Sequence, residues 1–104
     1  MTDGVVIFCT CSAEDEAFSI GKSLVEAQLA ACINVLPPLH SVYRWEGKVE
    51  TAKEILLFIK TTRERFLDVR DRITQLHSYD TPEIIALPIE AGSDKYLGWL
   101  REQV

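Results

Sequence analysis

Four side chains in this sequence could bind a metal ion or carry out thiol or proton chemistry. They are Cys9, Cys11, Cys32 and His77. A thiolate selects Cu(I), whereas an imidazole suits copper or zinc. His77 follows a charged amphipathic segment, so it could also be a proton shuttle or a cation that interacts with the last carbonyl groups of a helix. The residue types alone leave these roles open.

The cysteines also have structural interpretations. Cys9 lies in an apolar run, where a cysteine usually acts as a small core residue. Cys11 adds a second sulfur two residues later, on the same side if the strand extends that far, and such a pair can chelate a metal. Cys32 lies between apolar neighbours and is read as core. A nucleophilic role for Cys9 is disfavoured because apolar surroundings raise the pKa of a thiol.

Bulk properties restrict the class of protein. The chain has 104 residues, 47% hydrophobic and 26% charged, which predicts one globular domain over 1–104. A net charge of −5 argues against a nucleic-acid partner. We expect no membrane span, because no segment reaches about 18 uninterrupted apolar residues, and no signal peptide, because no basic region precedes the first apolar run. The cysteines are odd in number and lie on predicted strands, which fits reduced thiols in a cytoplasm. Nucleotide-binding and serine-nucleophile motifs are absent, so we expect no enzyme.

The hydrophobic periodicity predicts an α+β domain of order β-α-β-β-α-β with a terminal helix. This is the ferredoxin-like arrangement, with both long helices on one face of an antiparallel sheet. We expect Ser12 to cap the first helix, and we expect that helix to end near Ala30. Thr61 and Glu64 should form a capping box at the start of the second helix, and Ser93 should cap the last helix. The predicted strands are 4–10, 31–36, 39–46, 48–61 and 83–89. The apolar face of the first helix consists of Ala17, Ile20, Leu24 and Ala27, and that of the second helix consists of Phe66, Val69, Ile73 and Leu76.

Two features predict an oligomer. The strand segments "VVIFC" and "ILLFI" are apolar on both faces, yet two helices can cover only one face of a sheet. The strand 48–61 would be roughly 45 Å long, against about 17–20 Å for a typical strand. It must bend sharply or project onto a neighbour. Tyr43 and Trp45 give the tip of its hairpin an aromatic surface suited to an interface.

Several blocks of the chain resemble the CutA family of divalent-cation-tolerance proteins. They are "LAACINVLP" (29–37), "SVYRWEGKVE" (41–50), "IKTT" (59–62), "HSYDTPEIIALPI" (77–89) and "YLGWL" (96–100). The resemblance implies a PII-like, intertwined homotrimer that is cytoplasmic in bacteria and linked to heavy-metal tolerance and copper binding. The expected cofactor is Cu(I) or Cu(II), with other divalent cations binding more weakly.

The resemblance also suggests which residues hold copper. The cysteine near the end of the family's first strand matches Cys9, and its histidine before the "x-Y-x-x-P-E" block matches His77. Leu76 stands where some members have a second histidine, and Ser78 where a proline often follows. Nothing in the sequence separation of Cys9 and His77 shows that they meet, and the core and helix-end interpretations remain alternatives.

A second candidate site is a cleft between subunits, since PII-like trimers bind small ligands there. The polar and aromatic residues that could line it are Tyr43, Trp45, Lys60, Tyr79, Glu83 and Trp99. The alternative for these residues is a structural ion pair with aromatic packing at an interface. The functional hypotheses are therefore a metal-binding trimer, a PII-like signalling protein that takes a small ligand, and a structural trimeric scaffold.

Overall fold

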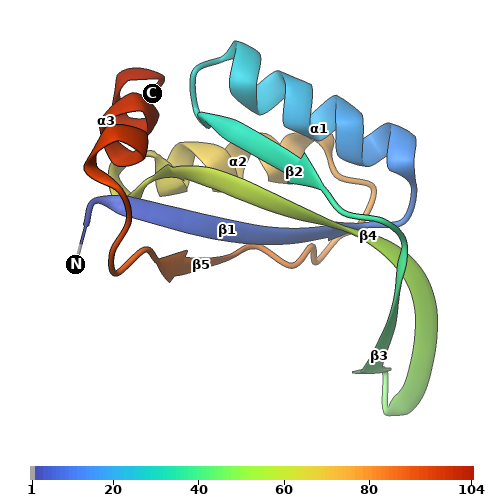
Figure 1. Ribbon diagram of the computed structural model, residues 1–104. Coiled ribbons are helices and arrows are strands. Elements are labelled where there is room, and N and C mark those ends of the chain that lie inside the picture. The colour runs from blue at the N-terminus through green and yellow to red at the C-terminus, as the bar shows by residue number, and fades with distance from the viewer. Residues whose placement is uncertain (1) are drawn as a thin grey trace.

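The computed structural model describes residues 2–104, which form five strands and three α-helices. The chain alternates these elements in the predicted order, and a short 3-10 helix, η1, precedes the second long helix (Figure 1). Their bounds are β1 Gly4–Cys11, α1 Glu14–Glu26, β2 Cys32–Val35, β3 Leu39–Trp45, β4 Lys48–Thr62, η1 Arg63–Arg65, α2 Phe66–Leu76, β5 Ile85–Pro88 and α3 Asp94–Glu102.

The sheet is antiparallel throughout, with the strand order β2-β4-β1-β5, and β3 pairs only with β4. Both long helices lie on one side of it (Figure 1). This arrangement confirms the ferredoxin-like βαββαβ prediction, with the second strand of that motif divided into β2 and β3. Within residues 2–104, no helix has the length and apolar character required to cross a lipid bilayer.

The core lies between the sheet and the two long helices. In β1 every second residue from Val5 to Cys11 is buried, and in β4 Ile55, Leu57 and Ile59 follow the same rule. Period-two alternation places these side chains on one face. Ala17, Ile20 and Leu24 of α1 and Val69 and Ile73 of α2 cover that face. Cys9 and Cys11 therefore point toward the helices, and both are fully buried.

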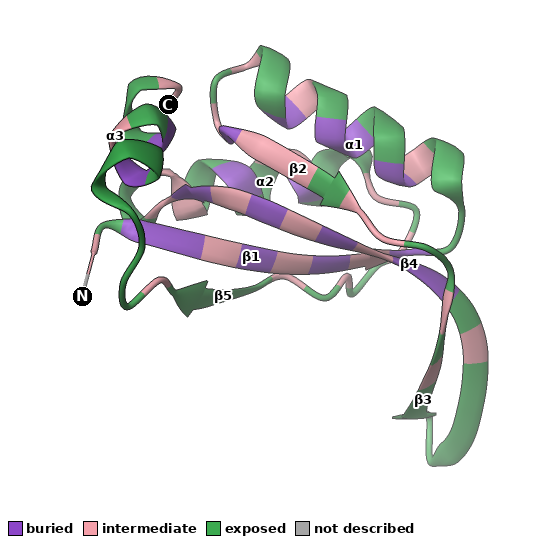
Figure 2. Cartoon of the chain, viewed as in Figure 1, coloured by how far each residue is buried: buried purple, intermediate pink, exposed green. Residues whose placement is uncertain are grey.

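The long strand β4 has two parts with different partners. Residues 55–62 pair with β1 inside the sheet, whereas residues 48–54 pair only with β3. This second part curves away from the sheet as a projecting hairpin, and nearly all of it is exposed (Figures 1 and 2). At its tip Gly47 adopts a φ of 80°, as the predicted tight turn requires. The strand thus both bends and projects, as its length predicts.

The two predicted caps on the long helices are wrong, whereas the third is confirmed. Helix α1 has Ala13, not Ser12, at its N-cap and ends at Glu26, before the expected Ala30. Thr61 is a buried strand residue whose hydroxyl donates to the Leu29 carbonyl at 2.6 Å, so it cannot cap α2. Ser93 does cap α3, where its hydroxyl accepts from the Tyr96 N–H at 3.1 Å.

The sheet face opposite the long helices is apolar and only partly covered. Phe8 and Phe58 stack there with ring centroids 5.0 Å apart. On the edge strand β5, Ile85 and Leu87 are exposed by 50% and 43%. One chain by itself thus leaves an apolar surface in water, which is typical of an interaction surface.

Candidate metal site and neighbouring cavity

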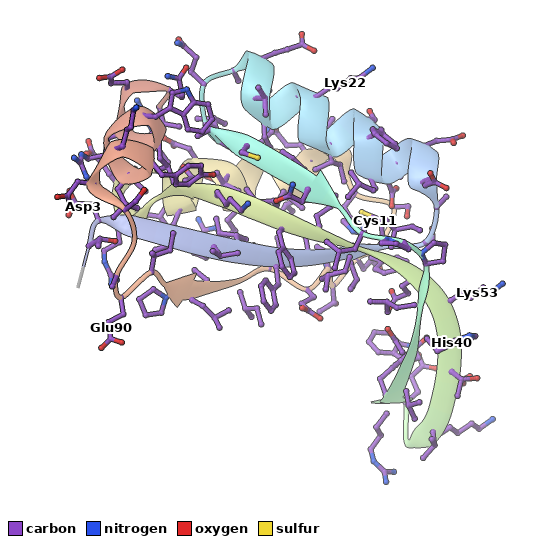
Figure 3. The ribbon with its side chains drawn as sticks, in the orientation of Figure 1. Asp3, Cys11, Lys22, His40, Lys53 and Glu90 are labelled. Atoms are coloured by element: carbon purple, nitrogen blue, oxygen red, sulfur yellow. The ribbon has the colours of Figure 1, made fainter. Side chains whose placement is uncertain are left out.

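Three soft or borderline donors converge at the end of β1. The sulfur atoms of Cys9 and Cys11 and a ring nitrogen of His77 lie within 4.8 Å of one another. Strand β1 supplies both sulfurs because residues two apart share a face. His77 comes from the segment directly after α2 and brings its ring over the same end of the sheet. In Figure 3, Cys11 lies at the end of β1, near the point where the hairpin leaves the sheet, whereas His40 lies on the hairpin, where it is exposed.

The His77 ring is held by a backbone partner on each nitrogen. The Tyr79 N–H points at Nδ1 at 3.0 Å, so Nδ1 is the acceptor. Nε2 then carries the proton and donates to the Thr10 carbonyl at 2.8 Å. The side chain is fully buried, and its ring does not bond the carbonyl groups of its own helix. The interpretation of His77 as a helix-end cation is therefore wrong, and the ring joins α2 to β1.

Carboxylates from two other elements hold the loop that carries His77. Glu16 of α1 accepts from the Ser78 N–H at 2.9 Å and from its hydroxyl at 3.1 Å. Glu54 of β4 is buried and accepts from the Tyr79 hydroxyl at 2.8 Å. Burial and this hydrogen bond to Glu54 raise the pKa of Tyr79, which stays a donor at neutral pH. Glu16 and Glu54 thus fix the position of the ring.

The two thiols in the cluster are not equivalent. A hydrogen bond between the side chains raises the pKa of Cys9 far above its usual range, and burial raises it further. The same bond lowers the pKa of Cys11, although burial opposes that shift. The two thiols interact, so the protons are lost in two steps that belong to the pair. A metal ion that binds both sulfurs has to displace these protons.

A cavity of about 770 Å³ lies beside the cluster, between the projecting hairpin and the loop after His77. Tyr43 and Trp45 of β3 and Tyr79 and Glu83 of the loop line it, together with Thr10, Ser41, Val42, Glu54, Asp80, Thr81 and Pro82. Four of the six residues predicted for the ligand cleft thus share one cavity. Lys60 and Trp99 are not part of it: Lys60 pairs with Val6 and Cys32 in the sheet, and Trp99 packs on Tyr96 in α3.

Sequence reasoning missed three groups that build this region. Glu16 was one of three acids in a helix's first turn, which pattern alone assigns to the helix dipole. Glu54 directly precedes an apolar run, and a charged residue beside core positions was the sequence signal that could have identified it. The Thr10 carbonyl carries no sequence signal, because any residue could supply it.

The donor set fits a thiophilic metal ion. Bonds of about 2.3 Å to sulfur and 2.0–2.1 Å to nitrogen place three ligands of one ion roughly 3.7–4.0 Å apart when they surround it in a plane. The three donors already lie within 4.8 Å of one another, so each pair needs to close by about 1 Å at most. Whichever nitrogen of His77 binds, one hydrogen bond is lost, either to the Tyr79 N–H or to the Thr10 carbonyl.

Comparison with known proteins identifies the family. The sequence profile of the CutA1 divalent ion tolerance protein family matches residues 5–103. The chain belongs to this family. The divalent-cation tolerance protein CutA of Thermus thermophilus is 48% identical over 97 residues, which cover 93% of this chain and 94% of that protein. The human protein CutA is 41% identical over 95 residues, and the match spans 53% of its length.

Solved structures of CutA proteins share the fold. The Thermus thermophilus Cut A1 structure superposes with a TM-score of 0.95 at 47% identity, covering 96% of this chain and 97% of that one. The CutA structure from Archaeoglobus fulgidus gives 0.94 at 43% identity, covering 96% and 97%. The CutA resemblance and the PII-like fold class are thereby confirmed. The family's name describes divalent-ion tolerance and names no reaction.

Proposed function

We propose that this protein is a cytoplasmic, homotrimeric copper-binding protein that contributes to heavy-metal tolerance and has no enzymatic activity. Cys9 and His77 would hold the ion. The observation that carries the proposal is that these residues, far apart in sequence, place their donor atoms within 4.8 Å of each other. A thiolate and an imidazole together suit copper better than the hard divalent ions, which prefer oxygen ligands.

The surroundings of the cluster supply a route for a cation. Both thiols and the imidazole are buried, so an ion must pass neighbouring groups. Thr10 and Tyr79, whose backbones hold His77, also line the cavity. Glu54 and Glu83 give that cavity a negative lining, and a cleft lined with one sign of charge concentrates the opposite ion. We infer that metal enters through this cavity.

The trimer in this proposal rests on the uncovered apolar surface. Besides the face formed by Phe8 and Phe58, the projecting hairpin exposes Val42, Val49 and Trp45. A surface of this kind is stable in water when a second subunit covers it. The number three in this proposal rests on the resemblance to the CutA family. The three unpaired cysteines support the proposed cytoplasmic location.

We expect the protein to bind Cu(I) more tightly than Zn²⁺ or Co²⁺. Divalent affinities rise from cobalt to copper, and a sulfur ligand further favours Cu(I). The measurement is an anaerobic competition titration against a chromophoric chelator for each ion. A Cys32→Ser variant is the matched control, because Cys32 lies on β2 outside the cluster and its loss should leave all three affinities unchanged. Cobalt binding as tightly as Cu(I) would contradict the proposal.

A PII-like role in binding a small ligand is the second candidate function. The cavity's volume of about 770 Å³ lies within the range of roughly 300–1,000 Å³ that ligand pockets occupy. Tyr43, Trp45 and Tyr79 give it aromatic surfaces, and Glu54 and Glu83 give it acidic groups. A ligand with an apolar ring and a cationic group fits this lining. In a trimer, this cavity would be the candidate for the cleft between subunits.

A further inference from the structure

We propose that Cys11 is a third ligand for the ion, so that one chain supplies two thiolates and one imidazole. This inference rests on the proposed metal-binding function and extends it to a specific donor set. It follows from the placement of Cys11, whose sulfur belongs to the same cluster as Cys9 and His77. A pair of thiolates selects monovalent copper more strongly than one thiolate does.

The backbone of β1 holds the two sulfurs in a position to share an ion. Cys9 is paired with Leu57 and Cys11 with Ile55, so β4 fixes both residues in a regular strand. Residues two apart on a strand have Cα atoms about 6.6–6.8 Å apart, and their side chains run nearly parallel. Both sulfurs can therefore contact an ion that lies above the strand between them.

The same geometry disfavours the alternative of a Cys9–Cys11 disulfide. Cβ atoms joined by a disulfide lie about 3.5–4.5 Å apart, well below the spacing of parallel side chains two residues apart on a strand. Closing the bond would require β1 to buckle and to break its register with β4. The pair is thus suited to bridging by a metal and not to direct oxidation.

Charge around the pair also favours a cation. Glu16 and Glu83 interact electrostatically with Cys9, and Glu16 and Glu54 interact with Cys11. These carboxylates oppose an accumulation of negative charge on two thiolates, and a bound cation offsets that charge.

The first test is X-ray absorption spectroscopy of the full-length protein loaded anaerobically with one equivalent of Cu(I). We expect two sulfur atoms and one nitrogen atom in the copper coordination shell. A single sulfur per copper would overturn the proposal, and this measurement does not depend on whether a variant folds. If wild-type protein retains no Cu(I), the proposed function itself fails, and this outcome is distinct from a shell with one sulfur.

The second test uses Cys11→Ala, with Cys32→Ser as the matched control. We expect Cys11→Ala to lose one sulfur from the copper coordination shell and to bind Cu(I) at least about 10-fold more weakly. Mutation of a residue that only supports a metal ligand already lowers metal affinity roughly 10–100-fold. Cys32→Ser should retain the wild-type spectrum and affinity. Unchanged Cu(I) affinity in a folded Cys11→Ala protein would show that Cys11 only fills the core.

Discussion

Cys9→Ser is expected to weaken Cu(I) binding by roughly 100-fold or more, because loss of a direct ligand exceeds the effect of its supporting contacts. Serine keeps the shape of the side chain but replaces a soft sulfur with a neutral oxygen that copper does not select. The buried site also excludes water that could take the place of the missing ligand. A competition titration against a Cu(I) chelator measures the change.

His77→Ala provides the companion measurement for the same site. The imidazole suits Cu(II), so this variant should lose more affinity for Cu(II) than for Cu(I). It also removes the bonds to Thr10 and Tyr79, so circular dichroism must first show an intact fold. If both variants bind both copper ions as wild type does, the metal site is elsewhere and the small-ligand function becomes the leading candidate.

Leu57→Ala is expected to lower the free energy of unfolding by about 2–5 kcal/mol, the usual range for a buried leucine. Leu57 is fully buried at the centre of β4, where it pairs with Cys9 and Val35 on either side. Its loss leaves a cavity in the core between the sheet and the long helices, beside Cys9. Denaturant unfolding at a fixed protein concentration measures the change, since subunit association adds to apparent stability.

Leu67→Ala is the matched control, because Leu67 lies on the outer side of α2 and is 57% exposed. Surface substitutions of this kind usually change stability by less than about 0.5 kcal/mol. Equal losses in the two variants would contradict the assignment of the core to the space between the sheet and the long helices.

Periodicity and turn chemistry were sufficient to predict the fold. Alternation in β1 and β4 places Val5, Ile7 and Cys9 on one face, and Gly47 supplies the positive φ of the hairpin. The capping box failed because its hydroxyl has a competing partner that the sequence does not reveal. Thr61 has the spacing of a capping box, but its buried strand position gives it the Leu29 carbonyl instead.

The site was only partly predictable for a related reason. Strand period placed Cys11 beside Cys9, but the approach of His77 depends on how α2 packs over the end of β1. The backbone partners of His77 leave no local pattern in the sequence, and neither do the hydrogen bonds that Glu16 and Glu54 accept from the loop after His77. Lys60 and Trp99 were predicted for a cleft between subunits. Within one chain they lie outside the cavity that the other four predicted residues line.

Native mass spectrometry of protein purified anaerobically and loaded with Cu(I) measures the number of subunits and the bound copper together. We expect a particle of about 35 kDa, three times the 11.8 kDa of one chain, that carries three copper ions. The Cys9→Ser variant should give the same trimer with less copper. A stable monomer of 11.8 kDa, or a wild-type trimer that retains no copper, would contradict the proposed copper-binding trimer.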